Sequence, residues 1–493
     1  MTRADTASAL TRAQLTAAGT PRRRLYIEAA PGSGKTTVAA QRFGVQRFHG
    51  RDQRAVLAVS FTRSATAELR DRVLTRWGRA ALDWPHRIVT LDTIVCDLLT
   101  HLLHTELVRW PAGHRQLTVL DQWRVLLSGT WTDKEPTVVL ESGRVLARAA
   151  RHAKKAHRPS TADVNAALAK GYCTHQNARH ILESALSTTG VHDAVLARFA
   201  ATARALIVDE VFDANALDLT LVRLATEAGL EVTLVGDPWQ ALYAWRGAVP
   251  EKVPNLVREA DFVQRDLHTS FRWRSTHQAR LADHLRTGQG LTLPQGQAKA
   301  VDVLIALQWK YLWEVDSDVL PLAFKSATGN VQEAACTLLL SEITQRAFAE
   351  NATFHGDALT TLGIDHEAWK RLRPSLQSLV DGLAGASAIA DIWASLNTVI
   401  ARESNRPTPR RHSTHTERLE NLRARLHSTS RLVPGLTAHQ AKGREWDIVG
   451  VCLTGAEQQI LRQGLRSDHE DHRKLYVALT RARDTTTVIP VDG

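Results

Sequence analysis

The stretch Ala29-Ala30-Pro31-Gly32-Ser33-Gly34-Lys35-Thr36 decides how this chain folds. It follows a short apolar run, Leu25–Ile27, and precedes Thr37–Ala40, which can open a helix. A glycine-rich turn between a strand and a helix directs backbone N–H groups at phosphates, at the positive end of the helix dipole. The stretch therefore predicts a site for a nucleoside triphosphate. The rest of the chain must indicate which process the hydrolysis of that triphosphate drives.

The residue types of this turn predict how each part would hold the nucleotide. The lysine of such a loop reaches the β- and γ-phosphates, and the hydroxyl that follows it binds Mg²⁺. We therefore expect the nucleotide to be bound by Ala30, Gly32, Ser33, Gly34, Lys35, Thr36 and Thr37, with Thr36 also a ligand of the metal.

Composition limits the class of protein and favours a polyanionic partner. The 493 residues are 44% apolar and 23% charged, which is typical of a soluble globular protein of roughly three to four domains. The net charge of +11 favours nucleic acid, although charge alone does not exclude a membrane surface. Neither a signal-peptide core nor a run long enough to cross a bilayer is present, so we expect a cytoplasmic protein with no membrane partner.

The cysteines argue against a metal or disulfide framework. Cys96, Cys173, Cys336 and Cys452 lie far apart, so none of the spacings of zinc or iron–sulfur sites occurs. We expect free thiols.

Short apolar runs bounded by turn or charged residues recur along the chain and indicate buried parallel strands. They are Val56–Val59, Ala205–Val208, Val232–Val235 and Ile448–Val451. We expect an α/β fold with two cores built on parallel sheets: residues 1–100 with 200–265, and residues 266–345 with 431–493.

Each core is expected to carry an insertion, residues 101–199 in the first and 346–430 in the second. In the first, Val139–His157 reads as a helix, and Ser160–Asp163 offers a capping box for another that ends near Gly171. In the second, Asn405–Thr416 has the composition of a mobile loop. A basic stripe is either a solvated helix face or a contact for a phosphate backbone. Its members are Arg144, Arg148, Arg151, Lys154, Lys155 and Arg158.

Two carboxylates, Asp209 and Glu210, follow the apolar run Leu206–Val208. An acid at the tip of a strand near a phosphate loop is placed to hold Mg²⁺, and the next acid can orient and deprotonate the attacking water. We expect Asp209 to bind the metal and Glu210 to act as the base.

The segment Leu234–Ala248, with the sequence LVGDPWQALYAWRGA, is much more specific. It strongly resembles the corresponding motif of the UvrD/Rep/PcrA group of superfamily 1 DNA helicases. The resemblance implies that Gln240 senses the γ-phosphate and that Tyr243, Trp245 and Arg246 meet single-stranded DNA. An aromatic face stacks on any base, which suits such a role. The alternative for Trp245 is a core tryptophan.

Further motifs resemble the same family in the same order. Gln14 corresponds to the glutamine that reads adenine, and Phe61 and Thr62 lie in a motif that contacts DNA, as Thr90 does in the next one. Phe271 would stack on adenine and Arg272 would reach the γ-phosphate. The remaining residues implied by the resemblance are Thr437 and His439 at DNA, Glu445 at the ribose, and Arg481 as the arginine finger.

The resemblance implies two RecA-like motor cores with mostly helical insertions, and ATP and Mg²⁺ as cofactors. Lys35 and the acid pair belong to the first core, and Arg272 and Arg481 to the second. Hydrolysis would open and close the cleft between the cores and drive 3′→5′ movement along single-stranded or tailed duplex DNA.

Three positions depart from the family pattern. Phe212 stands where the family has glutamine after the acid pair, so we expect a loosened relay, with core packing of Phe212 as the alternative. Asp92 replaces a histidine, and a carboxylate near phosphates is unfavourable, so Asp92 could instead orient a neighbouring group. Thr37 replaces a frequent arginine.

Three functions remain open at this stage. The first is a helicase of repair or recombination. The second is the same motor in antiphage defence, similar to the helicase subunit of Gabija systems, which works beside a partner nuclease. The third is a DNA-end sensor whose ATPase regulates a partner nuclease with little unwinding.

Overall fold

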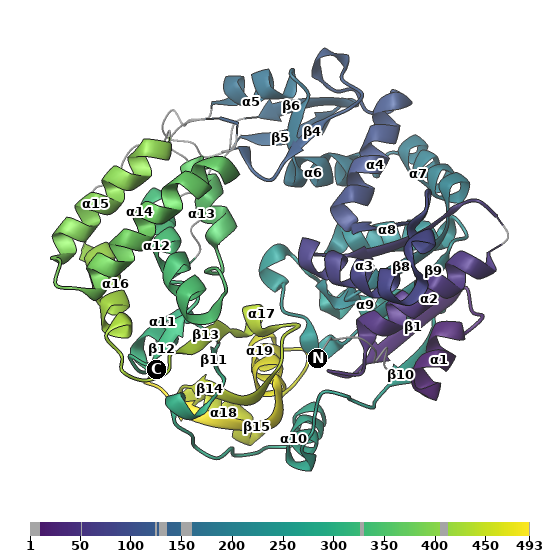
Figure 1. Ribbon diagram of the computed structural model, residues 1–493. Helices are drawn as coiled ribbons and strands as arrows, with labels where there is room; N and C mark the ends of the chain where they lie inside the picture. Colours follow the sequence, from purple (N-terminus) through teal and green to yellow (C-terminus); the bar gives the residue numbers. More distant parts are fainter. Residues whose placement is uncertain are drawn as a thin grey trace. The chain divides into compact units, whose positions relative to one another are not determined.

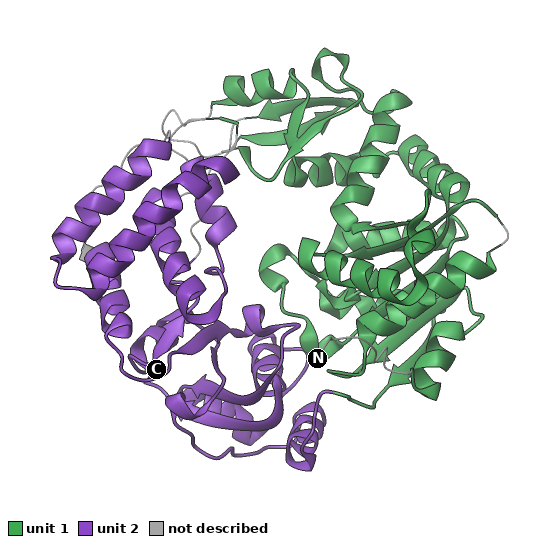
Figure 2. Cartoon of the chain, viewed as in Figure 1, with its two compact units in different colours: residues 1–271 green, residues 272–493 purple. Residues whose placement is uncertain are grey.

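The computed structural model describes residues 10–50, 52–123, 126–127, 136–148, 160–325, 330–404 and 413–492. The chain divides into two compact units, residues 1–271 and 272–493 (Figure 2). Each unit is built on its own parallel sheet, so the predicted α/β class with two parallel-sheet cores is confirmed.

The sheet of the first unit has six strands that all run parallel to their neighbours. Their order across the sheet is β10 (Val263–Leu267), β1 (Arg24–Ala29), β9 (Glu231–Gly236), β8 (Ala203–Asp209), β2 (Ala55–Ser60) and β3 (Arg87–Thr90). The predicted strands around Leu25, Val56, Ala205 and Val232 are all present.

Successive residues of these strands pack into different cores because side chains alternate across a sheet. Leu25 and Ile27 join one apolar cluster, and Tyr26 between them joins the other. The first cluster includes α1 (Arg12–Gly19), α2 (Lys35–His49) and α3 (Arg63–Trp77). The second includes α4 (Leu91–His104), α7 (Thr189–Thr202), α8 (Ala216–Glu227) and α9 (Val253–Glu259). Burial on both faces explains why the strands are almost continuously apolar.

The insertion of the first unit contains strands where a helix was predicted. Val139–Arg148 is not helical: β5 (Thr137–Glu141) and β6 (Arg144–Arg148) form an antiparallel hairpin. Ser142 and Gly143 connect them with φ of 48° and 72°, the conformation that a two-residue hairpin turn demands. The rest of the predicted helix, residues 149–157, lies outside the described residues.

The insertion also contains other elements (Figure 1). They are β4 (Thr118–Leu120) and β7 (Tyr172–Thr174), which pair in parallel, α5 (Thr161–Leu168) and α6 (His175–Ala185). Of these, α5 packs against β6 and α6 against β5. The predicted capping box is confirmed, because Ser160 accepts from the backbone of Asp163 and Asp163 accepts from the backbone of Ser160.

The predicted basic stripe is only partly described. Arg144 and Arg148 lie on strand β6 rather than on a helix, and Arg148 pairs with Glu141 across the hairpin. Arg151, Lys154, Lys155 and Arg158 lie outside the described residues.

The second unit has a five-stranded parallel sheet. Its order is β12 (Val319–Pro321), β13 (Val433–Thr437), β11 (Val303–Ala306), β14 (Trp446–Leu453) and β15 (Ala482–Pro490). Only β14 had been predicted from an apolar run. Shorter helices accompany this sheet: α10 (Thr276–Arg286), α11 (Trp309–Glu314), α17 (Ala438–Ala441), α18 (Gly455–Gln463) and α19 (Glu470–Leu479).

Five helices of the second unit share a separate apolar core (Figure 1). They are α12 (Val331–Phe348), α13 (His355–Leu362), α14 (His366–Ala384), α15 (Ile389–Glu403) and α16 (Ser413–Leu426). The predicted mobile loop Asn405–Thr416 is wrong at its end, since Ser413–Thr416 begins α16. Residues 405–412 lie outside the described part of the chain.

Two predictions about the whole chain can be compared with the described residues. All four cysteines are free, and three of them are buried. None of the helices in the described ranges is long and apolar enough to cross a membrane.

Phe212 is a core residue. It lies in a short 3₁₀ turn, η4 (Val211–Asp213), directly after the acid pair, and it is 4% exposed. Its ring meets Tyr26 edge to face with centroids 6.3 Å apart. A Cβ atom on Gly236 would lie 2.8 Å from the Phe212 ring, so β9 approaches this ring as closely as only glycine allows. The alternative that Phe212 packs in the core is therefore confirmed. Its ring is buried against Tyr26 rather than exposed at the nucleotide site.

Phe212→Gln should destabilise the protein without increasing its activity. The substitution removes an aromatic ring from a closed core and buries an amide in its place, which we expect to cost about 2–4 kcal/mol. The check is urea unfolding of both proteins. Thr220→Gln on the exposed face of α8 is the control and should leave stability within about 0.5 kcal/mol. Equal stability of Phe212→Gln and wild type would contradict the packing.

Candidate nucleotide and DNA sites

The predicted phosphate loop connects β1 to α2. Gly32 and Gly34 take left-handed conformations, with φ of 72° and 83°. Gly34 precedes α2 as its N-cap and supplies no side-chain hydrogen bond to the first turn. The first N–H groups of a helix have no partner within it, so this turn directs backbone donors and the helix dipole at an anion. The local backbone therefore has the form that the sequence predicted for phosphate binding.

Asp209 lies at the carboxyl end of β8 beside this loop. It is 1% exposed, and the hydroxyl of Thr36 donates a hydrogen bond to it. Burial raises the pKa of Asp209 to about 7, the neighbouring Glu210 adds to the rise, and the charge of Lys35 opposes it. A divalent cation would relieve the cost of that buried charge. Carboxylate and hydroxyl oxygens are the ligands that Mg²⁺ prefers, so Asp209 and Thr36 fit the expected metal.

Glu210 and Gln240 stand close to the same strand ends. Glu210 has φ of 61°, which is unusual for a residue other than glycine and is typical of functional sites. Gln240 closes a 3₁₀ turn, η5 (Pro238–Gln240), after β9, and its amide donates to Asp237 at 2.6 Å. Both residues thus lie at the carboxyl edge of the sheet, and the carboxylate of Asp237 holds the amide of Gln240 there.

Gln14 is positioned against the phosphate loop. Its Nε2 donates to the carbonyl of Ser33 at 2.8 Å, and its Oε1 accepts from the backbone N–H of Thr11 at 3.0 Å. A primary amide has two N–H groups and two lone pairs, so one of each remains to pair with a base. A Cβ at Gly34 would lie 2.7 Å from Nε2, which is a second reason for glycine there.

Phe271 lies beside the same loop. Its backbone N–H donates to the carbonyl of Gly32 at 2.9 Å, and its side chain is 55% exposed. An exposed ring next to the phosphate loop has the position expected of a residue that stacks on a nucleobase.

Arg72 is a neighbour of the site that the sequence did not reveal. This residue of α3 donates to the hydroxyl of Thr37 at 2.8 Å and pairs with Glu68 at 2.7 Å. A guanidinium therefore stands beside the first turn of α2, although position 37 itself is not arginine. No sequence signal marks this contact, since 35 residues separate the partners.

Tyr243, Trp245 and Arg246 form an exposed aromatic and cationic cluster after β9. Trp245 is 65% exposed, which excludes the alternative of a core tryptophan. The guanidinium of Arg246 lies 4.7 Å from the centre of the Trp245 ring and 5.4 Å from that of Tyr243. Such contacts hold the rings in place while leaving a face open, which suits base stacking.

The other predicted DNA contacts of the first unit follow two adjacent strands. Thr62 caps α3 by accepting from the N–H of Ala65 at 3.1 Å, and Phe61 beside it is partly buried. Thr90 precedes α4 and pairs with Thr93 at 3.2 Å. Because β2 and β3 are parallel neighbours, these residues share one edge of the sheet with the phosphate loop.

The second unit brings together three of its predicted nucleotide residues. Arg272 donates to Glu445 at 3.1 Å and to the carbonyl of Thr480 at 2.9 Å. Arg481, which directly follows Thr480, is fully buried, and its Nε donates to the carbonyl of Val477 at 2.9 Å. These residues lie at the amino ends of β14 and β15.

The predicted DNA contacts of this unit lie elsewhere. Thr437 and His439 follow the carboxyl end of β13, so they lie at the opposite ends of the strands from Arg272. The hydroxyl of Thr437 is engaged with Gln440 in a capping box that begins α17.

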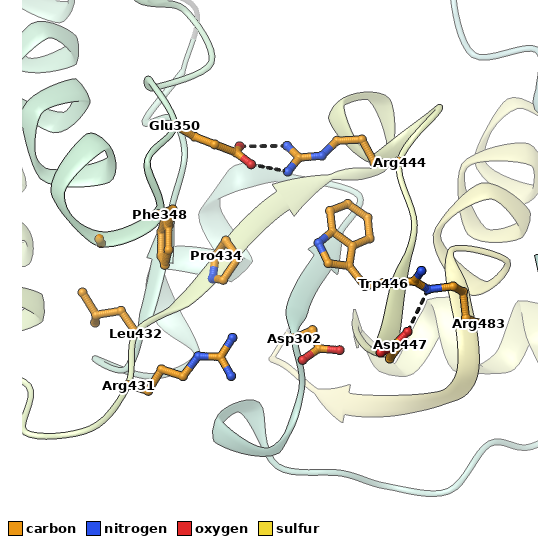
Figure 3. Close-up of a pocket in the computed structure, with 11 residues that line it drawn as sticks. Asp302, Phe348, Glu350, Arg431, Leu432, Pro434, Arg444, Trp446, Asp447 and Arg483 are labelled. Carbon is orange, nitrogen blue, oxygen red and sulfur yellow. Dashed lines mark hydrogen bonds and ion pairs between the residues drawn. The ribbon is translucent and has the colours of Figure 1, made fainter. Parts of the chain in front are cut away.

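A pocket of about 610 Å³ opens at the amino ends of β11, β13, β14 and β15 (Figure 3). Arg444 is bound there by both carboxylate oxygens of Glu350, at 2.6 and 3.0 Å, and its guanidinium lies over the ring of Trp446. Arg483 pairs with Asp447 at 2.7 Å. The predicted site residues do not line this pocket, and most of its charges are paired within the unit.

Two family models match this chain. The model of the UvrD/REP helicase N-terminal domain matches residues 10–261, and that of the UvrD-like helicase C-terminal domain matches residues 386–491. ATP-dependent DNA helicase Rep of Salmonella typhimurium is 28% identical over 257 residues, which is 48% of this chain and 37% of that protein. DNA helicase II of Escherichia coli is 24% identical over 50% of this chain and 36% of its own length.

These relatives are longer than the regions of them that match this chain. A probable DNA helicase of Mycoplasma pneumoniae is 25% identical over 50% of this chain and 49% of its own. The chain thus matches less than half the length of these relatives. The N-terminal family model alone nevertheless covers more than half of the 493 residues, and the chain therefore belongs to the UvrD/REP helicase family.

Proposed function

We propose that the chain is an ATP-driven motor that moves along single-stranded DNA in the 3′→5′ direction and unwinds tailed duplexes. One observation carries the proposal: a single sheet edge of the first unit holds both the phosphate loop with Asp209 and the exposed cluster of Trp245 and Arg246. Binding or hydrolysis of the nucleotide would then alter the position of the DNA-binding residues through a few residues of one sheet.

The residues of the first unit suffice for the binding step and the attack. The first turn of α2 and Lys35 bind the phosphates, and Mg²⁺ on Thr36 and Asp209 would offset the charge that develops on them. Glu210 takes the proton of the attacking water. Gln14 and Phe271 hold the base, as the positions of their amide and ring allow.

Residues of the second unit complete the transition state. We propose that Arg272 and Arg481 act on the γ-phosphate, so that hydrolysis removes a charge-assisted contact between the units and lets them move. The hydrogen bonds that fix Arg272 to Glu445 and Arg481 to Val477 hold both guanidinium groups before the nucleotide arrives.

The decisive measurement combines ATPase and strand-displacement assays. Single-stranded DNA should raise the ATPase rate, and duplexes with a 3′ tail should be unwound in preference to those with a 5′ tail. Strong ATPase stimulation without unwinding of either duplex would favour the DNA-end sensor. Absence of stimulation would contradict a DNA-driven motor of any kind.

Lys35→Ala should abolish ATP hydrolysis and leave the fold intact, because it removes a cation from the first turn of α2, and Lys35 belongs to neither apolar cluster of the first unit. The melting temperature and the ATPase rate are measured on the same preparation. Lys310→Ala in the second unit is the control and should behave as wild type. Normal turnover by a folded Lys35→Ala protein would contradict the phosphate-loop assignment.

Arg481→Ala should lower kcat by about 10³-fold while ATP affinity changes little, since a finger residue acts on the charge of the transition state. Arg483→Ala, two residues along the chain and paired with Asp447, is the matched control. A loss of stability with unchanged kcat would instead assign Arg481 a structural role in its buried site.

Trp245→Ala should weaken DNA binding by roughly 1–3 kcal/mol with little dependence on base sequence, because any base can stack on the exposed ring. Fluorescence anisotropy with labelled oligonucleotides measures the affinity, which should also fall as salt rises. Trp84→Ala removes another exposed tryptophan of the same unit as a control. Equal affinities of the Trp245 variant and wild type would exclude stacking at this position.

A further inference from the structure

Arg179 joins three helices of the first unit through one guanidinium. It lies on α6, within the insertion, and its Nε donates to Asp92 on α4 at 2.5 Å. Its Nη1 donates to Asp218 on α8 at 2.7 Å. The side chains of Arg179 and Asp218 are 20% and 3% exposed, so the contact is shielded from solvent.

The first carboxylate of this contact belongs to a segment expected to touch DNA. Asp92 lies in the first turn of α4, two residues after Thr90. Asp92 therefore holds a neighbouring group in place, as expected from its departure from the family pattern. That group is an arginine from the insertion.

The second carboxylate fixes the start of α8. Asp218 accepts from the backbone N–H of Asn215 at 3.0 Å, and Asn215 accepts in return from Asp218 at 3.0 Å. The residues just before Asn215 form the turn η4 that follows Asp209 and Glu210. The position of α8 is therefore linked to the strand tip that carries the acid pair.

The start of α8 is also bonded to the aromatic cluster. Asn215 pairs with Ala248 as an isolated β-bridge, and the N–H of Val249 donates to the carbonyl of Ala214 at 2.9 Å. Ala248 follows Trp245 and Arg246 by two to three residues. Movement of α8 would thus shift the backbone that carries the exposed rings.

We propose that Arg179 is a positioning residue that couples the nucleotide site to the two DNA-facing segments, through Asp92 on one side and Asp218 on the other. The proposal rests on the proposed function, because it assigns Arg179 to the step in which DNA accelerates hydrolysis. This coupling through Arg179 does not need the glutamine amide that the family has at the position of Phe212.

Arginine is required for this role by its geometry. Its planar fork presents Nε and Nη1 to two carboxylates at once, whereas the ammonium of lysine is a single point charge on a flexible stem. Burial raises the pKa of Asp218, and Arg179 opposes that shift. Loss of the guanidinium would therefore leave the buried carboxylate of Asp218 without its cation and would remove the contact between Asp92 on α4 and the helix α6.

The test compares basal ATPase with ATPase at saturating single-stranded DNA. Arg179→Met should reduce the DNA-stimulated rate at least about fivefold, within the usual range of coupling between sites, while basal turnover stays within twofold of wild type. Asp92→Ala, which leaves the pair with Asp218 intact, should reduce stimulation in the same way. Arg179→Lys should recover only part of it.

A double-variant cycle shows whether the two residues act together. If Arg179 acts through Asp92, adding Asp92→Ala to Arg179→Met should reduce stimulation little further. Arg115→Met, which breaks an exposed pair with Glu106 in the same region, is the control and should keep full stimulation.

Two results would overturn the proposal. One is a fall in basal and stimulated rates by the same factor together with a lower melting temperature, which is the mark of a structural residue. The other is unchanged stimulation in both Asp92→Ala and Arg179→Lys, which decides the question even if Arg179→Met fails to fold. A wild-type protein that DNA does not stimulate would instead contradict the proposed function.

Discussion

Backbone N–H groups at the start of α2 cannot be satisfied within that helix, and the first unit is organised around this constraint. A side-chain cap would fill the position, but Gly34 supplies none, and its left-handed conformation directs the chain into the helix. The sheet then determines what else can reach the same anion. Since all six strands are parallel, their carboxyl ends meet at one edge, where Asp209 ends β8 and Gln240 and Trp245 follow β9.

In each unit an arginine–carboxylate contact joins the sheet-bearing core to the added helices, but the two contacts differ in burial. In the first unit Arg179 is largely buried and contacts an acid that is 3% exposed. In the second, Arg444 and Glu350 join the segment before β14 to the end of α12, and both are about 40% exposed. Exposed pairs contribute about 1 kcal/mol or less, whereas breaking a buried pair costs several. Of these two contacts, the one between Arg179 and Asp218 is therefore the costlier to break.

Local sequence predicted the elements whose causes are local. The strand, turn and helix around Lys35 follow from apolar runs and glycines, and the capping box at Ser160 follows from two residues three apart. The hairpin at Ser142–Gly143 was missed because Leu, Ala and Arg nearby favour helix, although the Ser–Gly pair was the available signal. Strand β13 was hidden because it contains Pro434 and Gly435, which interrupt the expected apolar run.

The departures from the family pattern could not be interpreted from the sequence, because each is explained by a residue far away in the chain. The hydroxyl of Thr37 accepts a hydrogen bond from Arg72, 35 residues later in the chain, and Asp92 accepts one from Arg179, 87 residues later. Phe212 fills a space bounded by Tyr26 and closed by Gly236. Each departure is thus one half of a local solution whose other half only the folded chain brings into contact.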